Sequence, residues 1–259
     1  MIVVRLTTAA LALAWCGLVC GQGPLFAEAE QGAARPRPYV SALVGNDFAT
    51  LATAGSLEAI PGNTFTSFGN VDASILNGGG AVGLAVPRPV GQLRMEIEGR
   101  GRGSFTGPTY LTQNGPGTEI TLPLQVKLHD GWSALTNFWR DVFVTDTLGL
   151  YLGGGFGAGG YRYQVQGGDA LLPVSGPVVG NDTITTFAWQ AGTGIIWDVS
   201  DCITLDLGYR FFSYGPGSTP LTSDNGAGIS YLGNTSSSLS ASEVLFTVRI
   251  YEPFRSLVR

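Results

Sequence analysis

Apolar and polar residues alternate along much of this chain, in short stretches separated by turn-forming residues. A period of two places successive side chains on opposite faces of an extended strand. The pattern predicts eight strands, at residues 38–47, 77–87, 91–104, 131–141, 148–162, 184–198, 203–214 and 241–251. A chain made of such strands and turns belongs to the all-β class.

The connections between the predicted strands alternate in length. Tight turns are expected at 87–90, 142–147 and 199–202, and long loops rich in Gly, Ser, Thr and Asn at 48–76, 105–130, 163–183 and 215–240. Short turns on one side and long loops on the other are typical of an outer-membrane barrel. The pattern therefore predicts a transmembrane antiparallel up-and-down β-barrel of eight strands.

Several strands separate apolar from polar side chains cleanly. In the third strand Leu93, Met95 and Ile97 share one face, and charged residues occupy the other. The charged residues on the polar faces of the third, seventh and eighth strands are Arg94, Glu96, Glu98, Arg100, Arg102, Asp206, Arg210, Glu243 and Arg249. We expect these nine residues to face a narrow lumen and to form a charge network there.

A soluble barrel or sandwich would show the same alternation with its apolar face turned inward. Two tryptophans favour the membrane sense, because Trp189 and Trp197 share a face about 26 Å apart along a strand, which is roughly 20 Å along the membrane normal after tilt. Aromatic girdles of membrane barrels flank an apolar band about 25 Å tall. We expect Trp189, Trp197, Tyr209 and Phe211 to belong to such a girdle.

The glycine pattern and the low content of charged residues also favour a membrane barrel. One face of the fifth strand consists largely of Gly149, Gly153, Gly155, Gly157 and Gly159. Such a face has no purpose toward solvent, but in a narrow lumen it leaves room for large neighbours. Charged residues are 13% of the chain, against about 25% in typical soluble proteins.

The mean hydropathy is +0.20, yet no apolar run after Val19 is long enough for a membrane-spanning helix. The other structure that can span a bilayer is a closed barrel. The net charge is −5 and no basic stripe is present, which argues against nucleic acid as a partner.

The first residues have the layout of a secretory signal peptide. Arg5 precedes an uncharged apolar run at 6–19, and 27–29 offers a small-x-small cleavage site. We therefore expect a signal peptide at 1–29, cleaved near Ala29, and an outer-membrane barrel at 30–259 in a Gram-negative bacterium.

One stretch leaves two interpretations open. Residues 119–128 place apolar side chains on one parity, and that parity continues into Trp132 and Phe138. The stretch is either an extension of the fourth strand above the membrane, which we favour, or a separate strand behind a turn at 130–131. The second interpretation would give a ten-stranded barrel.

Several segments resemble the opacity-type, outer membrane protein A-like surface antigens. They are residues 137–141, 151–157, 187–192, 205–211 and 243–249. The resemblance implies an eight-stranded barrel with variable surface loops, in a family whose members are described as adhesins, structural proteins or small pores. Such barrels commonly end on an aromatic residue read by the barrel assembly machinery, whereas here Phe254 is followed by five further residues.

The expected lumen charges nearly cancel. Two interpretations are open: mutually paired structural charges, or a gate along a conducting path. An eight-stranded barrel is about filled by its own side chains, and unpaired charges in it would be costly. We therefore weigh structure above conduction.

The sequence contains few residues that could form a catalytic site. His129 is the only histidine, which excludes a multi-histidine metal site. Some outer-membrane barrels are lipid A deacylases in which a serine follows the histidine by two residues, but residue 131 is glycine. His129 and Ser133 share parity, and they are the pair to test.

We therefore expect a non-enzymatic protein with no catalytic, cofactor or metal site, and a structural or surface-interaction role through long extracellular loops. The alternatives are a small passive, porin-like channel and a lipid A-modifying enzyme. The expected partners are outer-membrane lipid, the barrel assembly machinery and an extracellular ligand held by the loops. We expect a monomer.

Overall fold

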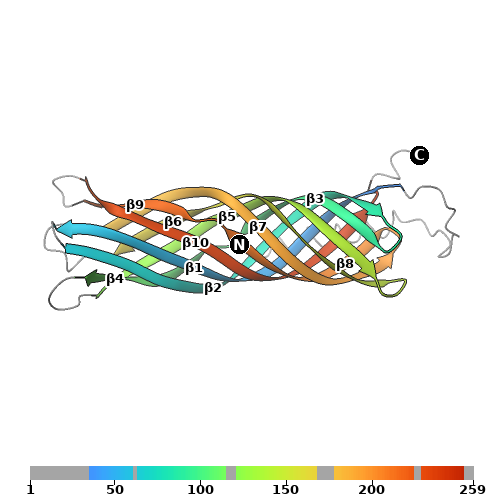
Figure 1. Ribbon diagram of the computed structural model, residues 1–259, viewed down its shortest axis with the longest axis horizontal. Coiled ribbons are helices and arrows are strands. Elements are labelled where there is room, and N and C mark those ends of the chain that lie inside the picture. Colours follow the sequence, from blue (N-terminus) through green and yellow to red (C-terminus); the bar gives the residue numbers. More distant parts are fainter. Residues whose placement is uncertain (1–34, 61–62, 115–120, 168–177, 225–228, 254–259) are drawn as a thin grey trace, which may run out of the picture.

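The computed structural model describes residues 35–60, 63–114, 121–167, 178–224 and 229–253, so the predicted signal peptide lies outside the described residues. Ten antiparallel strand segments make up nearly all of this part of the chain (Figure 1). They are β1 (Arg37–Ile60), β2 (Asn63–Pro87), β3 (Gln92–Arg102), β4 (Phe105–Asn114), β5 (Thr121–Phe143), β6 (Leu148–Gly167), β7 (Val178–Ser200), β8 (Ile203–Tyr214), β9 (Gly217–Asp224) and β10 (Ile229–Tyr251). Among these residues, no helix has the length and apolar character needed to cross a membrane.

The sheet closes on itself, because β1 pairs with both β2 and β10. β3 and β4 occupy one position of the ring, between β2 and β5, and β8 and β9 occupy another, between β7 and β10. The ten segments therefore fill eight positions, and the predicted eight-stranded barrel is confirmed.

Short breaks separate the two segments at each of these shared positions. Gly103 follows β3, and its amide donates to the carbonyl of Leu76 at 2.9 Å. Gly215 follows β8, and its amide donates to the carbonyl of Phe187 at 2.8 Å. The wall of the barrel thus stays hydrogen-bonded across both breaks. We call the part that contains β3 and β8 the lower barrel, and the part that contains β4 and β9 the upper barrel.

The tight turns of the lower barrel agree with the sequence analysis. The turn after β2 is closed by the amide of Arg88, which donates to the carbonyl of Gly91 at 2.9 Å, and Gly91 has a φ of +73°. A positive φ of this kind favours glycine. β1 begins and β10 ends at this same end of the barrel, on the right in Figure 1.

The prediction of long loops at the other end of the barrel is wrong. Within the described residues, most of 48–76, 105–130, 163–183 and 215–240 is strand, and β2 alone has 25 residues. Their Ser, Thr, Asn and Gly content is typical of loops, but here these residues form the outer wall of strands that continue upward. The eight-stranded tube is therefore much longer than its membrane-crossing part requires.

The two parts of the barrel bury opposite kinds of side chain. In the lower barrel the outward side chains are apolar and exposed, among them Val82, Leu84, Ile97, Leu150, Leu152, Phe187, Trp189, Trp197, Leu207, Val244 and Phe246. We call this band the lipid belt. In the upper barrel the apolar residues point inward and form the main core, which includes Leu51, Phe65, Val71, Leu124, Val126, Tyr161, Val165 and Leu239.

A bulge in β5 exchanges its two faces. The pairing of β5 with β6 shifts register between His129 and Trp132, and Asp130 has a φ of 55°. Because one extra residue reverses the alternation, Leu128 is buried at 1% exposure whereas Trp132 is 39% exposed. The stretch before the bulge is an extension of the fourth predicted strand, as favoured, but the expectation that its parity continues into Trp132 and Phe138 is wrong.

The inward glycines of β6 lie against large neighbours. A Cβ atom added at Gly153 would come 2.8 Å from Cε3 of Trp139, and one added at Gly159 would come 3.0 Å from Cδ1 of Tyr214. These contacts are too close for any side chain beyond hydrogen. The glycine face thus gives space to the aromatic rings that fill the bore, as the sequence analysis expects.

Candidate functional site

The candidate site is the charged interior of the lower barrel. All nine charged residues predicted for the lumen lie there, each at 7% exposure or less. Asp47 of β1 and Asp141 of β5, both 0% exposed, join them. Among the described residues, the lumen thus holds five arginines and six carboxylates.

The upper part of this network centres on Glu243 of β10. One of its carboxylate oxygens accepts from Arg100 at 2.5 Å and the other from Arg102 at 2.8 Å. Arg102 also donates to Asp47 at 3.0 Å. A single carboxylate is therefore shared by two guanidinium groups, one of which is shared in turn with a second carboxylate.

Glu98 holds the middle of the network. Its Oε1 lies 2.6 Å from Nε of Arg100, and its Oε2 accepts from Arg210 of β8 at 2.7 Å. The side chain of Asn137 also donates to Glu98, at 3.2 Å, and to Glu96 at 3.0 Å. Asn137 thereby links the middle of the network to its lower part.

The lower part is built around Asp141. It accepts from Arg94 at 2.8 Å and lies 3.4 Å from Nη1 of Arg249. Arg249 also donates to Asp206 at 2.9 Å. Glu96 lies 3.7 Å from Nη1 of Arg94, which completes a continuous chain of charges along the bore.

Neutral donors satisfy the carboxylate oxygens of Glu96. Glu96 accepts from the hydroxyl of Tyr39 at 2.6 Å and from the indole N–H of Trp139 at 2.7 Å. Loss of hydration on burying a charge costs several kcal/mol, and hydrogen bonds of this kind offset that cost.

Aromatic rings cover the guanidinium groups. The guanidinium carbon of Arg102 lies 3.8 Å from the ring centroid of Phe212, and that of Arg210 lies 4.6 Å from that of Trp139. Both distances are within the range of a cation–π contact. The rings and the ion pairs together occupy the interior of the lower barrel.

Several of the ion pairs cross the bore. Arg100 and Arg102 lie on β3, and their partner Glu243 lies on β10, which does not pair with β3. Arg210 of β8 likewise reaches Glu98 of β3. The charged side chains therefore act as crosslinks between opposite walls.

Above the charges, the interior becomes apolar. Phe212 and Tyr214 stack edge to face at 4.7 Å, and Tyr161 contacts Tyr214 at 5.3 Å. Higher in the upper barrel, burial raises the pKa of Tyr163 to about 12. A hydrated ion would meet the paired charges first and this apolar core next.

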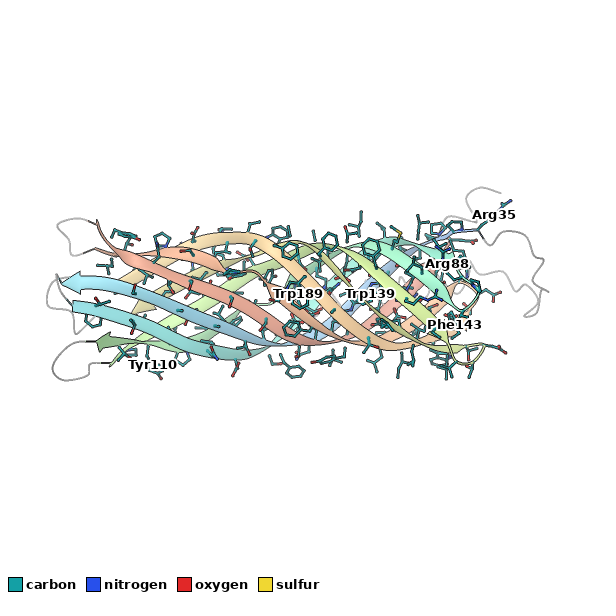
Figure 2. All side chains as sticks on the ribbon, in the orientation of Figure 1. Arg35, Arg88, Tyr110, Trp139, Phe143 and Trp189 are labelled. Atoms are coloured by element: carbon teal, nitrogen blue, oxygen red, sulfur yellow. The ribbon has the colours of Figure 1, made fainter. Side chains whose placement is uncertain are left out.

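The four residues predicted for an aromatic girdle point outward. Trp189, Trp197, Tyr209 and Phe211 are each between 39% and 51% exposed. Trp189 contacts Phe211 across β7 and β8 with ring centroids 5.4 Å apart. Trp189 lies near the middle of the barrel (Figure 2), where the lipid belt ends and the polar outer wall begins.

The pair of residues considered for an enzyme does not meet. Ser133 is buried in the lumen, where its hydroxyl accepts from Arg102 at 3.0 Å. His129 lies before the bulge and contacts Asp130 at 2.9 Å on the outer side. The expectation that His129 and Ser133 share a face is wrong, because the bulge between them reverses the alternation.

Sequence reasoning missed Asp47 and Asp141, although a signal was present. Asp47 has the opposite parity to Val40 and Val44, and Asp141 has the opposite parity to Phe138. Their strands have weak alternation, so neither polar face stood out. Both carboxylates nonetheless lie on the face opposite the apolar residues of their strand and point into the lumen, as the nine predicted residues do.

No family model matches this chain, and no curated protein matches it. Among solved structures, it is similar to the outer membrane protease OmpT from Escherichia coli, with a TM-score of 0.52 and 8% identity over 82% of this chain and 96% of OmpT. It is also similar to Neisserial surface protein A, with a TM-score of 0.33 and 14% identity over 82% of this chain and 96% of that one. At such identities the likeness shows the fold alone, which is the outer-membrane type of β-barrel.

Proposed function

We propose that this chain is a non-enzymatic, monomeric protein of the bacterial outer membrane that does not conduct ions and presents a rigid barrel wall to the cell's surroundings. Its lipid belt contacts outer-membrane lipid, and the barrel assembly machinery inserts it. The proposal keeps the surface-interaction role expected from the sequence, but assigns contact to the outer wall of the upper barrel in place of long loops.

One observation supports this proposal above the others: buried side chains occupy the bore in both parts of the barrel. Crosslinking ion pairs occupy the lower barrel, and an apolar core occupies the upper barrel. A passive channel needs a continuous polar path, and the apolar core interrupts one. Two hollows among the described residues lie on the outer wall.

The length of the strands supports the second half of the proposal. β1 and β10 continue for many residues above the lipid belt, and their outward side chains there are mostly Ser, Thr and Asn. A wall of this kind is compatible with water, and its inner face is packed. It would hold any contacting surface at a fixed distance from the membrane.

Conductance of the full-length protein in planar lipid bilayers tests the proposal. Folding is first verified by the different gel migration of heated and unheated samples. We expect silence, or only small and infrequent currents. Steady, large currents whose ion selectivity changes in Arg210→Ala, without loss of stability, would overturn the proposal and establish the channel alternative.

A further inference from the structure

A groove of about 750 Å³ crosses the outer wall of the upper barrel. It is lined by residues of four adjacent strands, namely Thr106, Gly107, Pro108, Pro123, Leu124, Gln125, Gln166, Gly167 and Val179. Its volume lies within the range of about 300–1,000 Å³ that is common for small-molecule sites. None of its lining residues carries a charge.

The register of the strands aligns the outward side chains of the groove in rows. Pro108 pairs with Gln125, Gln125 with Gln166, and Gln166 with Val179. Neighbouring strands are about 4.8 Å apart. Two glutamine amides therefore stand side by side at the spacing of the sheet, between a proline ring and a valine.

The two amides are available to a ligand. Both side chains are exposed, and the structure gives neither amide group a hydrogen-bond partner within the described residues. Each amide offers two donors and one acceptor. The next row continues the pattern with Gln164 and Asn181, which pair directly across β6 and β7.

Apolar surfaces flank the amides. The rings of Pro108 and Pro123 line one side of the groove. Tyr110, 49% exposed, pairs with Pro123 and lies toward the left-hand end of the barrel in Figure 2. The site thus combines neutral donors and acceptors with flat apolar faces, in the part of the wall that faces water.

We propose that this groove binds a neutral oligosaccharide. Sugar hydroxyl groups both donate and accept, which matches the amides, and the C–H faces of sugar rings match the proline and tyrosine surfaces. An anionic ligand would find only Lys127 in the adjacent row and no charge within the lining. The inference rests on the proposed surface-interaction role and names the ligand class of that role.

The test is calorimetric titration of the full-length folded barrel with neutral hexasaccharides of glucose, N-acetylglucosamine, galactose and mannose. The barrel is held in lauryldimethylamine oxide micelles, because detergents with sugar headgroups would compete for the groove. We expect at least one of these oligosaccharides to bind. Gln125→Ala and Gln166→Ala should each weaken binding about tenfold, which corresponds to about 1.4 kcal/mol.

Asn234→Ala is the matched control, since it removes an exposed amide from β10 on the far side of the ring. It should leave binding unchanged, and all three variants should keep the heat-dependent gel shift. The proposal is wrong if no neutral hexasaccharide binds at millimolar concentration, or if binding is unaffected by both glutamine variants. It is equally wrong if only a sulfated hexasaccharide binds and Lys127→Ala abolishes that binding. Each of these outcomes leaves the conductance test of the proposed function unaffected.

Discussion

Glu243 and Arg210 stand directly opposite each other in the pairing of β10 with β8, yet they do not form an ion pair with each other. Arg210 reaches Glu98, and Glu243 holds Arg100 and Arg102. Opposite charges on adjacent strands commonly pair along the sheet. Arg210 and Glu243 instead find their partners across the bore, so this part of the charged network holds opposite walls together.

Removal of one partner of this network should destabilise the barrel strongly. Arg210→Ala takes away a cation that Glu98 contacts at 2.7 Å. Loss of one partner of a buried ion pair typically costs about 3–5 kcal/mol, because the other charge stays buried. We expect a marked fall in the urea midpoint of unfolding, followed by gel migration or tryptophan fluorescence.

Thr183→Ala provides the control, because this residue is exposed on the outer wall of β7. Its midpoint should match that of the wild type, since surface substitutions usually change stability by less than about 0.5 kcal/mol. Equal midpoints for Arg210→Ala and Thr183→Ala would show that the charges are not crosslinks.

Much of the lower barrel could be predicted from the sequence. Alternation around Leu93, Leu207 and Phe246 identifies strands whose two faces differ in polarity, and the charged residues follow from the parity. The partners could not be predicted in the same way. Arg100 and Glu243 are 143 residues apart, and their contact depends on how the whole ring closes.

The upper barrel was harder to predict for a physical reason. Its strands bury apolar residues such as Leu51 and Leu239 and expose serine and threonine, which is the reverse of the pattern below. A sequence pattern that assumes apolar residues on the outer face therefore stops predicting the strand where the surroundings of the wall change from lipid to water. The groove beside Gln125 and Gln166 could not be predicted either. It depends on the pairing of these two residues across β5 and β6, and only the closed sheet fixes that register.

The boundary of the lipid belt can be measured with two matched arginine variants. Leu207 is 55% exposed within the belt, where an arginine near the bilayer midplane costs about 2–4 kcal/mol. Thr183 points outward from the same wall above the belt. We expect Leu207→Arg to reduce the folded fraction in lipid vesicles and Thr183→Arg to insert normally. The reverse ranking would mean that the lipid-facing part of the wall has been wrongly assigned.

The glycine face of β6 should tolerate no methyl group where it meets a large ring. At Gly153 an added Cβ would lie 2.8 Å from Trp139, whereas at Gly99, which faces outward, nothing lies within 4 Å. Gly153→Ala should therefore lower the unfolding midpoint by displacing Trp139, the indole that donates to Glu96. Gly99→Ala should be neutral or slightly stabilising, because alanine suits an open strand position better than glycine. A neutral Gly153→Ala would indicate that the bore has spare room.

The bulge at Asp130 should be indispensable to β5, because it brings Leu128 above it and Ser133 below it, which have opposite parity in the sequence, onto the same inner face. Deletion of Asp130 would restore a simple alternation, and either Leu128 would turn outward or Trp132 would turn into the lumen. We expect the deletion variant to lose the heat-dependent gel shift. Asp130→Gly keeps the extra residue and suits a φ of 55°, so it should fold normally. Asp130→Val should be destabilised, since β-branched residues disfavour positive φ. Wild-type folding of the deletion variant would show that the two faces of β5 are not exchanged at this position.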